Sequence, residues 1–348
     1  MRLDLFEAFR PLCPRCLHQR GVHSPLVIAS REEMRAGALW HGILHCPDAG
    51  CWLEFPVIDG VPVITADPAA TLKAQVWQAM RRDDLPPLVE SLLGDAAGPG
   101  SEFDTTRQHL GLYAGSQYQD WTGAGGTSSS GAVMAAALGG LAGLPEGPAL
   151  DIGCGTGRGG WEIAAATGRP ALACDLSLTF LRFAQRLLSE GQAAFPRRRI
   201  GTVFDRTLVS VPESHVAAPV DFWALDALAL PFPDAGLALC TLVNLVDCIA
   251  GPTEALTEAA RVTAPGGGAL VTTPYDWAPN VTPPAGWFGG HSQRATHAGD
   301  GEPVLRATLA RAGFEPLAEE TSVPWTLRLH ARAEMTYRLH MVLARRAA

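Results

Sequence analysis

Lysine is almost absent from this sequence of 348 residues, in which Lys73 is the only one, and Lys and Arg together number 27 against 35 Asp and Glu. The formal net charge of −8 argues against nucleic acid as a partner held by a broad basic surface. That mode of binding needs many cationic side chains to neutralise phosphates. Only a local basic patch is left open.

Long hydrophobic segments are also lacking. Residues 1–10 carry Asp4, Glu7 and Arg10 among their apolar side chains, so they do not resemble a secretory signal. The most apolar window, residues 131–144, is too short and too rich in glycine to span a bilayer. We therefore expect a cytoplasmic protein with no membrane partner, whose eight cysteines are thiols or metal ligands and not disulfides.

The sequence does contain enough apolar residues, 47%, for a large buried core, and its length favours more than one domain. Residues 1–66 are rich in Cys and His and contain short strand-like runs, the last two joined by a tight turn at Asp59 and Gly60. This pattern predicts a small β module. Residues 67–105 predict a helical linker, and residues 106–348 predict the main domain.

Strand-like and helical patterns alternate in the main domain, which is typical of a parallel sheet covered by helices on both faces. The predicted fold class is therefore α/β. Strands are expected near residues 148–152, 171–175, 220–225, 237–243 and 268–273, and helices near 130–142, 158–167, 177–190, 253–262 and 303–312. Residues 191–219 are too many for a simple connection, so an insertion with structure of its own is expected there.

A glycine-rich turn follows the first of these strands, in the stretch Asp151-Ile152-Gly153-Cys154-Gly155-Thr156-Gly157. Glycine lets the backbone approach a ligand without a Cβ clash, and this turn lies in the ligand-binding crevice of doubly wound sheets. Asp175 ends the next strand, where a ribose would need an acceptor for its hydroxyls. The glycine order differs from the Gly-x-Gly-x-x-Gly of dinucleotide sites.

The turn closely resembles the first motif of class I methyltransferases, which implies a Rossmann-like sheet and S-adenosylmethionine as the cofactor. Leu225-Asp226-Ala227 resembles the adenine-binding segment of that family, and residues 265–268 resemble its turn into the fifth strand. The resemblance implies these cofactor-binding residues: Asp151, Gly153, Cys154, Gly155, Gly157, Asp175, Leu176, Asp226, Ala227 and, from a preceding helix, Tyr118. The alternatives are glycines that serve packing only, and Asp175 or Asp226 as helix caps.

Asn244 and Asp247 follow the fourth predicted strand, at the mouth of the same crevice. Together with residues 273–277, 282–283, 287–290 and 324–346, they resemble the methyltransferase domain of the ovothiol pathway, which methylates a ring nitrogen of a mercaptohistidine. Carnosine N-methyltransferases are a more distant likeness. The resemblance covers about residues 105–348 and implies a small-molecule imidazole substrate.

The implied chemistry suggests roles for the residues of the acceptor side. A carboxylate that accepts the N–H of an imidazole fixes its tautomer and makes the other nitrogen a better nucleophile, and Asp247 is the candidate. Tyr275 and Tyr337 are expected to supply hydrogen bonds or a flat ring, while Asn244, Asp276 and Arg328 are expected to hold an amino-acid head group. The alternatives are Asp247 as a helix cap and Tyr337 as a half-buried strand residue.

Four cysteines in the N-terminal segment have the spacing of a tetrahedral zinc site: Cys13, Cys16, Cys46 and Cys51. Residues 55–63 resemble the small zinc-ribbon family that activates several RNA and protein methyltransferases. A structural zinc is therefore expected, with His41 or His45 as alternative ligands. Another function is also open, namely an RNA or protein methyltransferase that docks its substrate through the ribbon. A third is a non-catalytic protein that retains the fold. The sequence does not indicate an oligomeric state.

Overall fold

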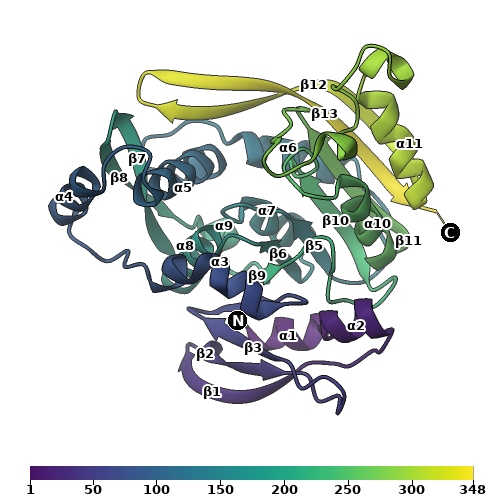
Figure 1. The fold of residues 1–348 in the computed structure, drawn as a ribbon, viewed down its shortest axis with the longest axis horizontal. Helices are drawn as coiled ribbons and strands as arrows, with labels where there is room; N and C mark the ends of the chain where they lie inside the picture. The colour runs from purple at the N-terminus through teal and green to yellow at the C-terminus, as the bar shows by residue number, and fades with distance from the viewer. Residues whose placement is uncertain (348) are drawn as a thin grey trace.

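The computed structural model describes residues 1–347, in which eleven strands form one continuous sheet with the order β1-β2-β3-β4-β9-β6-β5-β10-β11-β13-β12 (Figure 1). The five central strands pair in parallel. They are β5 (Ala149–Ile152), β6 (Ala171–Asp175), β9 (Val220–Leu225), β10 (Leu237–Val243) and β11 (Thr263–Thr273). These strands and the helices between them confirm the predicted α/β fold class.

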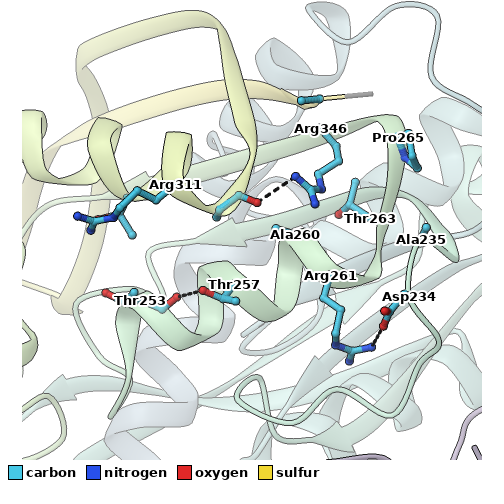
Figure 2. Close-up of a pocket in the computed structure, with 13 residues that line it drawn as sticks. Asp234, Ala235, Thr253, Thr257, Ala260, Arg261, Thr263, Pro265, Arg311 and Arg346 are labelled. Carbon is cyan, nitrogen blue, oxygen red and sulfur yellow. Dashed lines mark hydrogen bonds and ion pairs between the residues drawn. The ribbon is translucent and has the colours of Figure 1, made fainter.

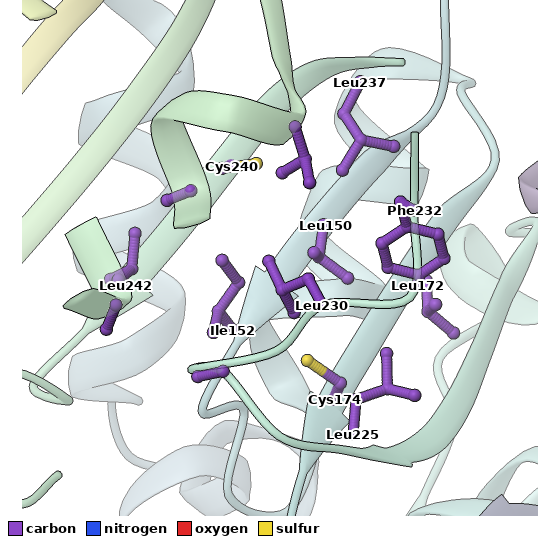
Figure 3. Packing of buried hydrophobic residues seen from close by; sticks show 14 of the residues in the cluster. Leu150, Ile152, Leu172, Cys174, Leu225, Leu230, Phe232, Leu237, Cys240 and Leu242 are labelled. Carbon is purple, nitrogen blue, oxygen red and sulfur yellow. The ribbon is translucent and has the colours of Figure 1, made fainter. Parts of the chain in front are cut away.

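Successive side chains of the central strands enter two different cores, one on each face of the sheet. In β9, Phe222 belongs to one core and Trp223 to the other, and all six residues of this strand are buried. The sequence of a strand that is buried on both faces is a nearly continuous run of apolar residues, because neither face needs polar side chains. Figure 3 shows the core that contains Leu150, Leu172 and Phe232.

Helices cover both faces of the sheet. One core takes side chains from α5 (Glu102–Tyr118), α6 (Ser129–Gly139), α7 (Arg158–Thr167) and α8 (Leu178–Glu190). The other core takes side chains from α1 (Leu3–Phe9), α2 (Pro14–Arg20), α10 (Pro252–Val262) and α11 (Glu302–Ala312). Helix α8 shows why the boundaries were predictable: the Ser177 hydroxyl accepts from the Phe180 N–H at its start, and Gly191 ends it with φ of 70°.

The N-terminal segment is built into the main sheet. Its strands are β1 (Val27–Arg35), β2 (Ala38–His45), β3 (Glu54–Ile58) and β4 (Val61–Ile64). The expected turn at Asp59 and Gly60 joins β3 to β4, with φ of 50° and 78°. Strand β4 then pairs in parallel with β9 of the central sheet. On the sheet face, the ring of Phe9 lies 6.0 Å from that of Trp223.

Two hairpins extend from the central body. The expected insertion forms β7 (Gln192–Ile200) and β8 (Val203–Ser210), followed by the short helix α9 (Glu213–Val216). The long C-terminal hairpin consists of β12 (Phe314–His330) and β13 (Ala333–Arg346), and β13 pairs antiparallel with β11. In Figure 1 this yellow hairpin runs across the top of the molecule towards β7 and β8. The Ala331 N–H donates to the Arg199 carbonyl, 3.3 Å away.

The remaining elements are helices on the surface. They are α3 (Pro68–Met80), α4 (Pro87–Ala97) and the single turns η1 (Gln119–Trp121), η2 (Pro284–Gly286) and η3 (Thr296–Gly299). Asp67 caps α3 by accepting from the Ala70 N–H. Of the helices in residues 1–347, none is both long enough and apolar enough to cross a membrane.

Candidate functional site

A cavity of about 640 Å³ opens where the central parallel strands end. The loops after β5, β6, β9 and β10 each contribute to its lining, as expected at the carboxyl ends of strands in a doubly wound sheet. Its volume is within the range of small-molecule sites. Eight of the ten residues that were expected to bind a cofactor line the cavity: Asp151, Gly153, Cys154, Gly155, Asp175, Leu176, Asp226 and Ala227. Gly157 is in the same turn but is not part of the lining.

The glycine-rich turn passes close to its neighbours at two positions that exclude a side chain. Gly153 has φ of 72°, and a Cβ there would lie 2.6 Å from the Leu245 side chain. Gly157 has φ of 96°, and a Cβ there would lie 2.4 Å from the ring of Phe222. Both conformations are costly for L residues with a side chain. The turn is thus held in one shape, with its backbone facing the cavity.

Asp151 lies beneath this turn and is almost fully buried. The Thr241 hydroxyl donates to its Oδ1 across 2.6 Å, which joins the end of β5 to β10. Burial raises the pKa of Asp151 to about 6, because the charged form loses its hydration. The side chain therefore fixes the base of the turn.

Asp175 and Asp226 line the cavity from the ends of β6 and β9. Asp175 accepts the N–H of Gly155 at 2.9 Å and that of Ser177 at 2.8 Å, so its carboxylate is tied to the turn. Asp226 accepts from the Leu228 N–H at 2.9 Å. These backbone contacts orient both carboxylates beside the cavity. Both can therefore accept hydrogen bonds from one ligand bound there.

The helix that covers the turn presents a different tyrosine from the one expected. Tyr118 does not line the cavity; it is completely buried, and its hydroxyl donates to the Thr156 carbonyl at 2.8 Å. Tyr113 and Gln117 lie one helical turn apart on the face that lines the cavity. The Gln117 amide donates to the Cys154 carbonyl at 3.0 Å and accepts from the Thr156 hydroxyl at 2.7 Å.

Arg158, at the start of α7, sets the position of that helix. It forms two bonds with Asp120, at 2.7 and 2.8 Å, and one with Glu162 at 2.6 Å. The same guanidinium donates to the Gln117 carbonyl at 2.8 Å. Because Arg158 is buried, its bonds to Asp120 and Gln117 fix the rotation of α5 relative to α7. That rotation determines which face of α5 lies against the glycine-rich turn.

Asn244 and Asp247 lie where they were expected, at the end of β10 and in the cavity lining. Asn244 has φ of 53°, a conformation that asparagine tolerates better than most residues, and its Oδ1 accepts from the Thr272 hydroxyl at 2.7 Å. Asp247 is 4% exposed; its Oδ2 accepts from the Asp276 N–H at 3.1 Å, while its buried Oδ1 has no hydrogen-bond partner in residues 1–347.

The isolation of this carboxylate changes its acidity. Burial raises the pKa of Asp247 to about 7, and the bonds from its own backbone, Thr273 and Asp276 oppose that rise only in part. A buried oxygen without a partner is costly unless a ligand or water supplies a donor. Asp247 therefore brings a buried oxygen without a partner to the wall of the cavity.

Three further residues, from the long hairpin and from the loop after β11, line the end of the cavity that contains Asp247. We call this the acceptor end. Trp325 and Tyr337 are cross-strand partners in β12 and β13, and both line the cavity. The Tyr337 hydroxyl donates to Oδ2 of Asp276 at 2.6 Å. Trp325 was not expected in the site, although the alternation of Val323, Trp325 and Leu327 in the sequence is a signal that could have found it.

Two expected acceptor residues lie elsewhere. Tyr275 has φ of 56°, and its ring points away from the cavity, where its hydroxyl lies 2.6 Å from Nδ1 of the buried His340. Arg328 is on the other face of the hairpin from Trp325, as strand alternation requires for an odd separation, and it pairs with Glu334 at 2.6 Å. Neither residue contributes to the cavity.

A second cavity lies between α10, α11 and the C-terminal segment (Figure 2). It lies beside the start of β11, whereas the first cavity lies where the parallel strands end. Its arginines are engaged by the protein: Arg261 with Asp234 at 2.9 Å and Arg346 with the Ala312 carbonyl at 3.1 Å, as the dashed lines in Figure 2 show. This groove therefore offers no chemistry comparable with that of the first cavity.

The four N-terminal cysteines lie together. The Sγ atoms of Cys13 and Cys51 are 3.7 Å apart, those of Cys16 and Cys46 are 3.6 Å apart, and all four lie within 4.8 Å of one another. With zinc–sulfur bonds of about 2.3 Å, the edge of a tetrahedral site is about 3.8 Å. The residues therefore fit a tetrahedral metal ion.

Comparison with solved structures gives limited likenesses. A methyltransferase from Methanosarcina mazei is 15% identical, with a TM-score of 0.41, over 60% of this chain and 96% of that chain. Phosphoethanolamine N-methyltransferase 2 of Haemonchus contortus is 13% identical, with a TM-score of 0.41, over 62% and 52%. Geranyl diphosphate C-methyltransferase of Streptomyces coelicolor is 14% identical, with a TM-score of 0.42, over 62% and 76%.

The sequence comparison is more direct. No curated protein matches the chain, but residues 150–271 match the family described as "Methyltransferase domain". The matched segment begins in β5 and ends in β11, so it contains the glycine-rich turn and the ends of β5, β6, β9 and β10 that line the cavity. The chain is an S-adenosylmethionine-dependent methyltransferase.

Proposed function

We propose that this enzyme transfers the methyl group to a ring nitrogen of an imidazole in a small histidine-like molecule. The observation that carries the proposal is Asp247, which lines the same cavity as the glycine-rich turn and whose buried Oδ1 has no hydrogen-bond partner within residues 1–347. A neutral imidazole has one N–H donor and one lone-pair nitrogen on opposite sides of the ring. Asp247 is suited to hold the donor while the other nitrogen faces the methyl group.

The cofactor end of the cavity fits S-adenosylmethionine, which when bound supplies an electrophilic methyl group on a sulfonium. The backbone from Gly153 to Gly155 forms a surface without side chains, on which a ligand can lie closely. Asp175 is placed to accept from ribose hydroxyls, and Asp226 from an adenine amino group. Gln117 holds the turn in place, so that these acceptors keep their spacing.

Asp247 does two things in the proposed reaction. Before transfer, its carboxylate accepts the ring N–H, which selects the tautomer whose lone pair faces the methyl carbon. During transfer, that lone pair forms the new N–C bond, the electrons of the broken S–C bond stay on sulfur, and the ring becomes cationic. Asp247 then takes up the N–H proton, for which its raised pKa of about 7 is well matched.

The test is a turnover assay with S-adenosylmethionine and a panel of histidine, mercaptohistidines, carnosine and related imidazoles. Release of S-adenosylhomocysteine and the mass and position of the new methyl group are measured for each. A product methylated on a ring nitrogen supports the proposal. If the protein binds the cofactor and methylates none of these imidazoles, the proposed substrate is wrong, and an RNA or protein substrate becomes the next to examine.

We also infer that the four N-terminal cysteines hold a structural zinc ion, on the basis of their sulfur spacing. Burial raises the pKa of the Cys13 thiol and raises that of Cys16 to about 11, so these two thiols are protonated at neutral pH without a metal. Metal binding would displace those protons and contribute directly to folding. Since β4 is a strand of the main sheet, the N-terminal segment is better suited to a structural role than to docking a separate substrate.

A further inference from the structure

The acceptor end of the cavity is negatively charged and has no cationic counterpart. Five aspartates line the cavity: Asp151, Asp175, Asp226, Asp247 and Asp276. Within residues 1–347, no Lys, Arg or His side chain is part of that lining. The one arginine that was expected to reach it, Arg328, lies on the outer face of the hairpin and is paired with Glu334.

A substrate carboxylate would therefore meet like charges. Beside Asp247 and Asp276, it would lose its hydration without gaining an ion pair, and like-charge contacts of this kind exclude ligands. Asn244 offers a neutral amide N–H at this end, because its Oδ1 accepts from Thr272. One amide group does not replace the cationic clamp that amino-acid carboxylates usually require.

A substrate ammonium group would instead find favourable partners. Asp276 offers a carboxylate, held in place by the Tyr337 hydroxyl at 2.6 Å. The aromatic side chains of Trp325 and Tyr337, which are cross-strand partners, line the same end. A carboxylate combined with aromatic rings is an established way to hold a cationic amine.

The cofactor has a carboxylate of its own, and Gln117 and Ser130 in the lining would hold that group. Ser130 is in the first turn of α6, where backbone N–H groups favour an anion. The two ends of the cavity therefore differ in the charge that they accept.

We propose that the methyl acceptor is a cationic amine without a free carboxylate, held by Asp276, Trp325 and Tyr337. This inference rests on the proposed function and narrows it: the substrate is an imidazole that carries an alkylamine, or a histidine whose carboxylate is removed or blocked. It also implies that a decarboxylation or a carboxyl-capping reaction supplies the substrate.

The test measures binding to the full-length protein saturated with S-adenosylhomocysteine, by calorimetry. Four imidazoles are compared: histamine, histidinamide, histidine and imidazolepropionate. Histamine and histidinamide should bind about tenfold or more tightly than histidine, and imidazolepropionate should bind most weakly. If histidine binds as tightly as histidinamide, the inference is overturned, while the proposed methylation of an imidazole still stands.

A variant and a second pair of ligands separate the remaining outcomes. Asp276→Asn keeps an acceptor for Tyr337 and removes the charge, so the preference for histidinamide over histidine should fall roughly tenfold. An unchanged preference would contradict the role of Asp276. Phenethylamine and phenylpropionate then test charge without an imidazole: a preference for the amine, with no imidazole methylated, would support the charge selection and refute the imidazole substrate.

Discussion

Tyr337 donates a hydrogen bond to Asp276, with 2.6 Å between its hydroxyl oxygen and Oδ2. The two residues are 61 positions apart in the sequence, and the bond joins the long C-terminal hairpin to the loop after β11. Both residues line the cavity, and the bond between them lies at its solvent-exposed rim.

Removing the hydroxyl should therefore weaken the acceptor site. Tyr337→Phe keeps the ring and loses the bond, so we expect the KM of the acceptor to rise about fivefold to tenfold, with little change in kcat, consistent with about 1 kcal/mol for one hydrogen bond. Steady-state kinetics measure both constants. Tyr275→Phe is the matched control, because its hydroxyl contacts His340 outside the cavity, and its KM should stay near that of the unmodified enzyme.

Asp247 should be required for methyl transfer and dispensable for cofactor binding. Asp247→Asn keeps the shape of the side chain but cannot take up a proton, so the rate should fall by about 10² to 10⁴. The Kd for S-adenosylhomocysteine should be unchanged, because the cofactor contacts lie at the other end of the cavity. A rate close to that of the unmodified enzyme would remove Asp247 from the mechanism.

The same variant should alter the dependence of stability on pH. The pKa of Asp247 is raised from 3.8 to about 7 in the folded protein, so the folded state holds this proton more tightly than the unfolded state. Its contribution to stability is fully present below pH 4 and is lost as the pH rises through 7. Asparagine does not titrate, so the stability of Asp247→Asn should not fall in this way as the pH rises.

We therefore expect Asp247→Asn to gain stability relative to the unmodified protein between pH 5 and pH 8, by at most about 3 kcal/mol. Denaturant unfolding at both values measures the difference. Asp205→Asn is the control of opposite sign: the bond from Arg199 lowers the pKa of Asp205, so its loss should not stabilise the protein at pH 8. Equal effects of the two substitutions at both pH values would contradict this account.

Gln117 should matter for the cofactor although it was not expected in the site. Gln117→Ala removes the contacts to the Cys154 carbonyl and the Thr156 hydroxyl, which hold the glycine-rich turn. We expect the Kd for S-adenosylmethionine to rise about tenfold, as judged by calorimetry. Gln108→Ala, on the same helix but bonded to Asp104, should bind the cofactor normally.

The cysteine cluster should contain one zinc ion per chain. Cys16→Ser should lower the measured zinc content and the Tm together, because the metal stabilises the N-terminal segment only in the folded state. Cys240→Ser removes a buried thiol of the central sheet, and its zinc content should be unaffected. Metal-free protein with an unchanged Tm after chelation would show that the thiols pack without an ion.

The central sheet and the glycine-rich turn were predictable because their signals are local. The central strands are short runs of mostly apolar residues, and α8 is bounded by Ser177 directly before it and Gly191 directly after it. Helices α1 and α2 were not predicted, since residues 1–66 were expected to be entirely β. The ring of Phe9 in α1 packs against those of Trp223 and Phe232, more than 200 positions away, and no local sequence pattern predicts such partners.

The candidate site was predictable to the extent that its residues follow strand ends. Asn244, Asp247, Asp175 and Asp226 met that condition, and all four line the cavity. The choice between Tyr113 and Tyr118 depends on the rotation of α5, which the ion pairs of Arg158 determine in three dimensions. The face of the hairpin on which Arg328 lies likewise depends on the register of β12 with β13.

The pairing of β4 with β9 also affects solubility. Without β4, β9 would be an edge strand of the sheet: Ala224 and Leu225 would lose their partner residues, and five of the six residues of β9 are apolar. An open, apolar strand of this kind is a template for association with other chains. The N-terminal segment thus protects the methyltransferase sheet from aggregation, whatever else its cysteines do.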